Sequence, residues 1–382
     1  VDANLFYWFF ENQNETAPII VFINGGPGCS SVVFSLYESG PLMVDGKDVV
    51  ENPFSFAKFS HLLFIDSPIG TGLSYGNVFR TKESEIALDF TNALIQFFEL
   101  FPKLQNNDLW LVAESYGGKY APYIAETFLK HRFGSMLKGV AIGNGLVDPL
   151  HQSSSWSAYA YNAGLVDKQQ ASKVAVMERQ LVALLENNQF TQANALNQQI
   201  LVALLTEGAW FSPTFITQYG FPELSVGEAW LQANRHHLRV SNKVPKINSA
   251  CNDDVAAALA NDTMTSVAYK YAALLDVYDL KVLIFNGNMD FTIPTTSVES
   301  WLNALKWSGQ AQFLKSKRTF WRTAPKDPFA VGGYVKQSKQ LTFVSVPNAG
   351  HQVCGDRREA ASQMIEYWVN YKDLPSGTPF PP

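Results

Sequence analysis

The stretch that most constrains the fold runs from Leu109 to Lys119 and reads Leu-Trp-Leu-Val-Ala-Glu-Ser-Tyr-Gly-Gly-Lys. Its apolar first half is typical of a short buried strand, and the two glycines indicate a sharp turn into a helix. Such a turn exposes the hydroxyl of Ser115 above a sheet edge, and the small residues Ala113 and Gly117 let neighbouring backbone approach. Because a serine among small residues is more often an ordinary turn, this stretch alone leaves both interpretations open.

Composition narrows the class of protein. The chain has 382 residues, of which 47% are hydrophobic and 16% charged, so a folded protein with one large core, or a core with an insertion, is expected. The net charge of −5 does not favour binding to nucleic acid or to an anionic membrane surface. No apolar run approaches the roughly 18 residues that a membrane span requires.

Strand-like and helix-like segments alternate along both ends of the chain, which predicts an α/β protein with a mostly parallel sheet covered by helices on both faces. Strands are expected at 5–10, 19–23, 62–66, 109–114, 139–142, 282–285 and 341–346. Helices are expected at 83–101, 119–131 and 264–275.

The middle of the chain departs from this alternation. Residues 167–207 contain no strand-like run and predict two amphipathic helices broken near Asn187-Asn188, whereas 208–250 look aromatic and irregular. We therefore expect a first part of the core at 1–165, a helical insertion at 166–250 and a second part of the core at 251–382.

Three residues of catalytic type each follow an expected strand, in the order Ser115, Asp290 and His351. The carboxyl ends of parallel strands meet at one sheet edge, and this order is that of the α/β-hydrolases. An isolated aspartate at a strand end is usually a helix cap, and an isolated histidine is usually structural, but the combination favours a catalytic triad. The remaining histidines lack the spacing of a metal pair, so no metal site is predicted.

The loop Asn24-Gly-Gly-Pro-Gly-Cys-Ser-Ser31 follows the second expected strand. A glycine-rich loop can cradle a phosphate, but the Walker spacing and its lysine are absent. An oxyanion hole is the better interpretation, with the N–H groups of Gly26 and Tyr116 as the candidate donors.

These motifs together resemble the serine carboxypeptidases over nearly the whole chain. The matching segments also include Ile65–Gly72, Glu114–Tyr120, Gly143-Asn-Gly145 and Asn286-Gly287, and the stretches 93–102 and 106–108 look most like the vitellogenic-like carboxypeptidase branch. The resemblance implies an α/β-hydrolase core under a mainly helical cap and no cofactor. It also implies removal of single residues from peptide or protein C-termini, best at acidic pH, in the secretory pathway, a lysosome or vacuole, or outside the cell.

By the same resemblance, the terminal carboxylate of the substrate is bound by Asn24, the Gly25 N–H and Glu114, with Glu38 as the partner of Glu114. Two buried carboxyl groups in contact share a proton, so one can donate a hydrogen bond to the substrate. Without the resemblance, Glu38 would be interpreted as a solvated charge at a helix end.

The resemblance also gives roles to pocket residues and cysteines. Phe22 stands where the family usually has tryptophan, and the side chains near the departing residue include Val33, Tyr37 and Gln352, which suggests an uncharged C-terminal residue. The three cysteines permit one disulfide or none. The family pattern pairs Cys29 with Cys251, leaves Cys354 free, and lacks the other cap disulfides here, which suggests a mobile cap.

Two sequons, at Asn14 and Asn261, would be glycosylated only in a secreted protein. We expect a missing N-terminal piece, because the chain begins close to a strand, and the oligomeric state is left open, a homodimer included. Two alternatives to the carboxypeptidase remain: an acyltransferase or lyase on the same scaffold, and a non-catalytic partner that protects or scaffolds another hydrolase.

Overall fold

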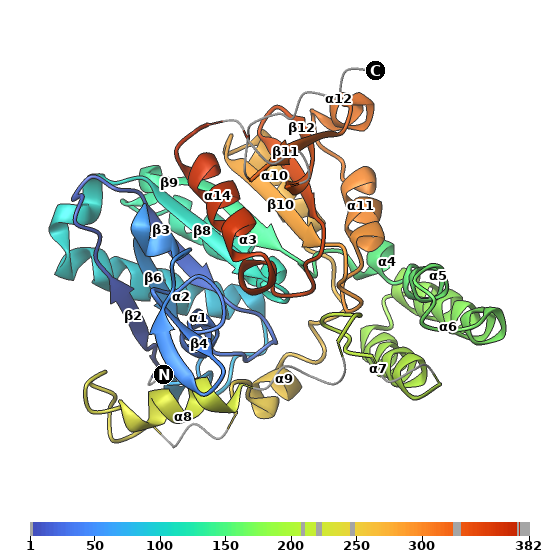
Figure 1. Cartoon of the computed structure of the whole chain (residues 1–382), viewed down its shortest axis with the longest axis horizontal. Coiled ribbons are helices and arrows are strands. Elements are labelled where there is room, and N and C mark those ends of the chain that lie inside the picture. Colours follow the sequence, from blue (N-terminus) through green and yellow to red (C-terminus); the bar gives the residue numbers. More distant parts are fainter. Residues whose placement is uncertain are drawn as a thin grey trace.

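A nine-stranded sheet forms the centre of the molecule (Figure 1). The structure is a computed structural model that describes residues 3–207, 211–218, 224–244, 249–323, 330–372 and 374. The strands are ordered β11, β12, β13, β10, β9, β8, β3, β6 and β2 across the sheet. Their bounds are Tyr7–Phe10 (β2), Ile19–Ile23 (β3), His61–Ile65 (β6), Leu109–Glu114 (β8), Leu137–Gly143 (β9), Lys281–Gly287 (β10), Thr319–Arg322 (β11), Val331–Ser338 (β12) and Leu341–Val346 (β13).

The strands from β13 across to β6 run parallel, and antiparallel strands close both edges. This confirms the predicted mostly parallel sheet. The register of β3 against β8 matters most for the site, because Ile23 lies opposite Ala113 at the carboxyl ends of both strands. Asn24 and Glu114 therefore leave the sheet at the same edge.

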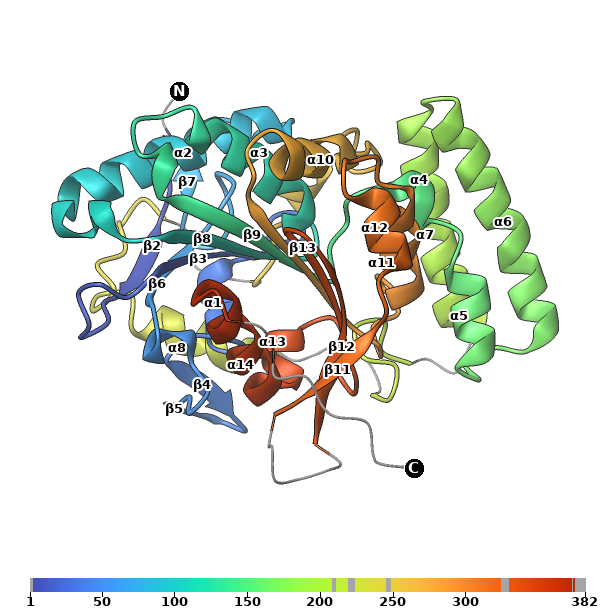
Figure 2. The same cartoon turned by 90° about the horizontal axis from the view of Figure 1, so that it is seen from above.

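Helices cover both faces of the sheet (Figure 2). One face is covered by α2 (Glu83–Leu100), α3 (Gly117–Leu129), α10 (Ala268–Asp276), α11 (Thr295–Ala304) and α12 (Gln310–Lys315). The other carries α1 (Ser31–Ser35), α13 (Val353–Asp356) and α14 (Arg358–Val369). The predicted helix at 83–101 corresponds to α2, whose buried Ile86, Phe90, Leu94 and Phe97 recur at helical spacing, and it ends just before Pro102.

The helices α5 (Trp156–Asn162), α6 (Lys168–Glu186) and α7 (Phe190–Glu207) pack on one another as a third apolar cluster, beyond the short α4 (Pro149–Gln152). Figure 1 shows them projecting from the side of the sheet domain. The gap between α6 and α7 confirms the predicted break near Asn187-Asn188. The division of the chain at residues 166 and 250 stays a prediction.

Several elements differ from the sequence expectations. Residues 208–250 were expected to be irregular, which is wrong for α8 (Ser225–Ala233): Leu231 packs in the same apolar cluster as α1 and α14. The helix expected from 264 begins later, at Ala268. The pattern also missed the hairpin of β4 (Leu42–Asp45) and β5 (Asp48–Glu51), the pair β11–β12, and the small sheet of β1 (Ala3–Asn4) and β7 (Tyr75–Gly76), because short, partly exposed strands leave a weak period. The helix α9 (Asp253–Ala258) follows the second cysteine.

Within the described residues, no helix combines the length and the apolar composition needed to span a bilayer. A disulfide joins Cys29 to Cys251 across a sequence separation of 222 residues, as the resemblance implied. Backbone hydrogen bonds from Ser30 N to Ala250 O (2.8 Å) and from Asn252 N to Gly28 O (2.9 Å) flank it. The glycine-rich loop is thereby attached to a distant part of the chain.

We expect the double variant Cys29→Ala/Cys251→Ala to lose up to about 5 kcal/mol of unfolding free energy, because the crosslink closes a long loop in the unfolded chain. Denaturant unfolding with and without reductant measures this loss. Cys354, the buried free thiol, provides the control: Cys354→Ala should remain sensitive to reductant, whereas the double variant should not. An unchanged midpoint in the double variant would contradict a stabilising crosslink.

Candidate active site

Ser115 occupies the tight turn between β8 and α3, with a left-handed backbone conformation (φ 57°) that non-glycine residues rarely adopt. Its N–H donates to Gly143 O (2.9 Å), and its carbonyl accepts from Gly118 N (2.9 Å). A Cβ added at Gly25 would lie 2.5 Å from Tyr116 N. Only glycine therefore allows the loop after β3 to lie directly against the serine turn.

Asp290 and His351 lie together, as their places after β10 and β13 predicted. A hydrogen bond of 2.7 Å joins His351 Nδ1 to Asp290 Oδ2, and both side chains are buried. Asn144, which follows β9, donates from Nδ2 to the same Oδ2 (2.6 Å), and its Oδ1 accepts from Gly287 N (3.2 Å). The aspartate is thus held from two neighbouring strands.

Ser115 Oγ and His351 are not hydrogen-bonded to each other in the described structure. In ligand-free sites such a bond is often long and shortens when substrate binds. The His351 backbone is fixed independently: its N–H donates to Thr214 O (2.6 Å). The preceding Gly350 N–H donates to Asp356 Oδ2 (2.8 Å).

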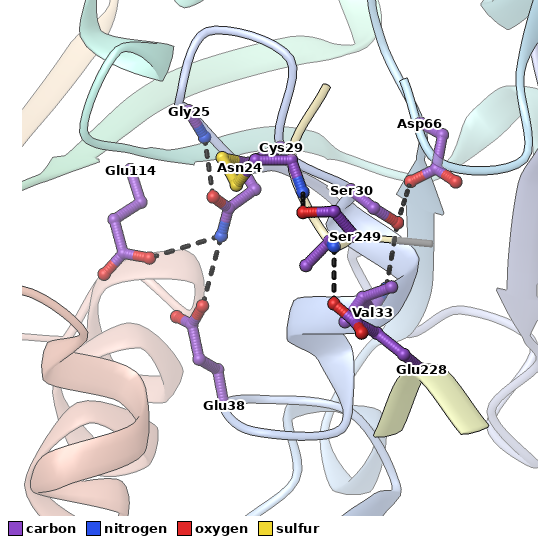
Figure 3. The surroundings of a disulfide bond; sticks show 12 residues. Asn24, Gly25, Cys29, Ser30, Val33, Glu38, Asp66, Glu114, Glu228 and Ser249 are labelled. Carbon is purple, nitrogen blue, oxygen red and sulfur yellow. Dashed lines mark hydrogen bonds between the residues drawn. A yellow bond between two sulfur atoms is a disulfide. The ribbon is translucent and has the colours of Figure 1, made fainter. Parts of the chain in front are cut away.

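Asn24, Glu38 and Glu114 form a buried polar cluster (Figure 3). Glu114 directly precedes Ser115 in the chain, so this cluster adjoins the serine turn. Asn24 Nδ2 donates to Glu38 Oε1 (3.2 Å) and to Glu114 Oε2 (3.4 Å), while its Oδ1 accepts from the Gly25 N–H (2.8 Å). The two carboxyl groups are coupled electrostatically, and Glu38 Oε2 and Glu114 Oε1 are buried without a hydrogen-bond partner among the described residues. The structure thus brings together the four residues expected to form a carboxylate site.

Both carboxyl groups of this cluster hold their protons unusually firmly. Burial raises the pKa of Glu38 from 4.5 to about 8, opposed by the neighbouring side chain of Glu114 and increased by the charge of Asp356. Burial, followed by the charge of Glu38, raises the pKa of Glu114 well above its usual value. A shared proton therefore remains on the pair at neutral pH.

The same charges affect His351. Burial by itself lowers the imidazole pKa, but the charge and hydrogen bond of Asp290, with smaller contributions from Glu38 and Asp356, raise it above its usual value of 6.5 overall. Burial raises the pKa of Asp356 to about 6, and the Gly350 N–H opposes that rise. Protonating the Glu38–Glu114 pair removes negative charge from beside His351, and it therefore lowers the imidazole pKa.

A cavity of about 340 Å³ has Ser115 in its lining. Gly26, Pro27 and Tyr116 form one wall, so the two expected oxyanion donors adjoin the serine. Helix α7 also contributes residues to the lining. The lining residues are Gly26, Pro27, Ser115, Tyr116, Leu146, Pro149, Gln152, Ser153, Trp156, Asn194, Asn197, Gln198, Leu201, Ala256, Thr263, Met264, Thr292, Ile293 and Ser297.

The four expected pocket residues do not line this cavity. Phe22 is buried against Phe64, with ring centroids 5.6 Å apart, and Val33 is buried in α1. Tyr37 Oη accepts from Gly227 N (2.9 Å) at the start of α8, and Gln352 lies next to His351. Their role around the departing residue stays a prediction.

The sequence analysis missed a buried ionic group beneath the site. Lys119, one turn after Ser115, donates from Nζ to the carbonyl of Asp262 and to both oxygens of Thr265 (2.9 Å each). Burial raises the pKa of the nearby Glu83 to about 8, aided by Asp262. Lys119 thus holds the segment containing Thr263, which lines the cavity, against the helix that begins at the serine.

Among the other expectations, the two sequon asparagines, Asn14 and Asn261, are both exposed. Asn261 Oδ1 accepts from Thr191 Oγ1 of α7 (2.9 Å). Cys354 is a buried thiol near the carboxyl pair, and burial raises its pKa well above the usual value. The described residues contain no cluster of three or more potential metal ligands.

Comparison with known proteins agrees with this geometry. The serine carboxypeptidase family model matches residues 1–371. The chain is 30% identical to a probable serine carboxypeptidase CPVL of Dictyostelium discoideum, covering 98% of this chain and 77% of that protein. It is 32% identical to a venom serine carboxypeptidase of Apis mellifera (97% and 82% covered).

Among solved structures, the chain is similar to KEX1ΔP, a prohormone-processing carboxypeptidase from Saccharomyces cerevisiae. The TM-score is 0.86 and the identity 25%, and the match covers 97% of this chain and 87% of that one. The family match over nearly the whole length and the similarity of the folds lead to one conclusion. The chain belongs to the serine carboxypeptidase family, and it is a serine-type carboxypeptidase with an α/β-hydrolase fold.

Proposed function

We propose that Ser115, His351 and Asp290 hydrolyse the C-terminal peptide bond of peptides or proteins, while Asn24, Glu38 and Glu114 bind the free terminal carboxylate. The observation that carries this proposal is that Glu114 joins the two groups of residues. Its side chain accepts a hydrogen bond from Asn24, and its backbone is linked to Ser115 by a peptide bond. A chain end bound at that cluster has its last peptide bond within reach of the serine. A carboxylate site next to the serine therefore favours cleavage at the C-terminal end of the substrate, which is exopeptidase activity.

The chemistry requires a base, because a serine hydroxyl is too weak to attack an amide unaided. His351 takes the Ser115 proton and later gives it to the departing amino group, while Asp290 orients the ring and stabilises its cation. The N–H groups of Gly26 and Tyr116 stabilise the oxyanion, each contributing about 3–4 kcal/mol. Water then releases the shortened peptide from the acyl-enzyme.

Acidic conditions support the substrate-binding half of this mechanism. The protonated Glu38–Glu114 pair can donate a hydrogen bond to a carboxylate, whereas an ionised pair would repel it. The same protonation lowers the pKa of His351, so that more imidazole is neutral and able to act as base at a given acidic pH. We therefore propose acidic pH as the working condition.

The proposed location is the secretory pathway, either a lysosome or vacuole or the extracellular space. The disulfide between Cys29 and Cys251 supports an oxidising compartment. The exposed sequons at Asn14 and Asn261 are accessible to glycosylation.

The reaction is tested by incubating blocked dipeptides at pH 4–7 with the wild type and with Ser115→Ala. We expect the wild type to release the free terminal amino acid and the variant to lose at least about 10³-fold in rate. Turnover of esters with negligible peptide cleavage would instead indicate an acyltransferase. If the folded wild type cleaves neither peptides nor esters, a non-catalytic role is the remaining interpretation.

Asn144 is proposed as a positioning residue, because it holds Asp290 through a 2.6 Å hydrogen bond without facing the substrate cluster. We expect Asn144→Ala to lower kcat about 10–100-fold with little change in KM, since a misplaced base slows only the chemical step. Asn348 also has a left-handed backbone (φ 57°) but is exposed, so Asn348→Ala controls for the change in backbone preference. A kcat for Asn144→Ala within twofold of the control would refute this role.

The carboxyl pair predicts an alkaline limb in the pH profile. The wild-type kcat/KM should fall as pH rises through about 8, where Glu38 loses its proton, and Glu38→Gln/Glu114→Gln should lack this fall because an amide stays neutral. The wild-type unfolding free energy should also fall between pH 4.5 and about 8, because the folded state binds more protons in that window.

Glu83 supplies the matched control for that experiment. It is also a buried glutamate whose pKa is raised to about 8, but it lies in the Lys119 group rather than in the carboxylate cluster. Glu83→Gln should therefore keep the alkaline limb of kcat/KM. Should the double variant keep the wild-type fall as well, the shared proton is not its cause.

A further inference from the structure

Helix α7 presents three distinct faces. Ala193, Ile200 and Leu204 are buried in the apolar cluster with α6. Gln198 and Gln199 are both exposed to solvent, but Gln198 lines the cavity beside Ser115 and Gln199 does not. A third face carries Asn194, Asn197, Gln198 and Leu201 at positions i, i+3, i+4 and i+7, and all four line the cavity beside Ser115. The cap helix therefore turns a stripe of carboxamides, here called the amide face (Asn194, Asn197 and Gln198), toward the site.

The amide face is not occupied by internal hydrogen bonds. Among the described residues, Asn194 Oδ1 is buried without a hydrogen-bond partner, and the side chains of Asn197 and Gln198 make no hydrogen bond. Gln152, in the same cavity, differs because its side chain has structural partners: Oε1 accepts from Val147 N–H and Nε2 donates to Gly145 O. A buried acceptor without a partner costs free energy unless a ligand satisfies it.

Among the residues that the structure describes, none in the cavity lining supplies a counter-charge for a charged group. The lining consists of apolar and neutral polar residues, with Tyr116 the single titratable type, and α7 carries no charged residue before Glu207. A carboxylate, ammonium or guanidinium group entering this cavity would lose solvation without gaining a counter-charge. A neutral group that both donates and accepts hydrogen bonds matches the amide face.

The position of the cavity identifies which part of a peptide enters it. Gly26 and Tyr116, the proposed oxyanion donors, form its wall, whereas Asn24, Glu38 and Glu114 lie outside its lining. The residue whose carbonyl contacts the oxyanion donors is the one that acylates the serine. Its side chain, that of the penultimate residue, therefore points toward the amide face.

We propose that the amide face of α7 selects peptides whose penultimate residue is neutral and hydrogen-bonding, glutamine and asparagine first. This inference rests on the proposed function, because it names the residues of the same site that bind the acyl part of the substrate. A carboxamide side chain of the substrate satisfies Asn194 Oδ1 by donation and accepts from a neighbouring amide. Charged residues at this position are disfavoured by desolvation, and apolar ones leave Asn194 Oδ1 unsatisfied.

The test uses blocked dipeptides with one constant C-terminal residue and Gln, Glu, Met or Lys before it. For the wild type we expect kcat/KM with Gln to exceed that with Glu and Lys at least tenfold, and that with Met about three- to tenfold. In Asn194→Leu/Gln198→Leu, the Gln-to-Met ratio should fall to one or below. Gln199→Leu, which changes the neighbouring glutamine outside the cavity lining, should keep the wild-type ratios.

A near-isosteric variant keeps the test independent of folding. Asn194→Asp places a charge at the buried oxygen, and we expect the Gln-to-Lys ratio to fall at least fivefold while Gln199→Glu, with the same charge outside the cavity, leaves it unchanged. An active wild type with equal kcat/KM for all four peptides would overturn this inference alone. A folded wild type that hydrolyses none of them would overturn the proposed function as well.

Discussion

The parallel pairing of β3 with β8 is the constraint on which the rest of the site depends. It ends both strands at one level, so that the loop after Ile23 and the turn after Glu114 meet above the sheet. The contact is so close that a side chain at Gly25 would collide with the backbone of Tyr116. One contact thereby brings three things together: the nucleophile, the proposed oxyanion donors and the cluster proposed to bind a chain end.

Electrostatics then determines what this contact can do. The charges of Asp290, Glu38 and Asp356 all act on the imidazole of His351, and Glu114 is coupled to Glu38. Asp290 is held by hydrogen bonds from His351 and Asn144. The Glu38–Glu114 pair instead avoids charge by keeping a proton, because buried like charges repel. The two sets are coupled, since the protonation state of the pair changes the negative charge that His351 experiences.

The sequence could predict the parts of the site that follow strongly patterned strands. Ser115 directly follows a buried apolar strand, and Asp290 and His351 come a few residues after the ends of β10 and β13. The bounds of β3 and β13 match the expected ones at both ends. The pairing of Glu38 with Glu114 came from family resemblance rather than from periodicity. Asn144 lies between two glycines after a strand, which the sequence shows. Its hydrogen bond to Asp290 joins residues 146 positions apart, so the neighbouring sequence does not predict it. Lys119 and Glu83 were missed for the same reason, because burial of a charge depends on packing between distant segments.

The central claim is that the buried cluster of Asn24, Glu38 and Glu114 recognises a free chain end. It is tested most directly by comparing kcat/KM at pH 5 for one peptide with a free C-terminal carboxylate and for its C-terminal amide. The account predicts that amidation lowers kcat/KM at least about 100-fold, because the cluster's hydrogen bonds to an ionised carboxylate are lost. Equal rates for the two peptides would contradict it, since the chain end would then play no part in binding.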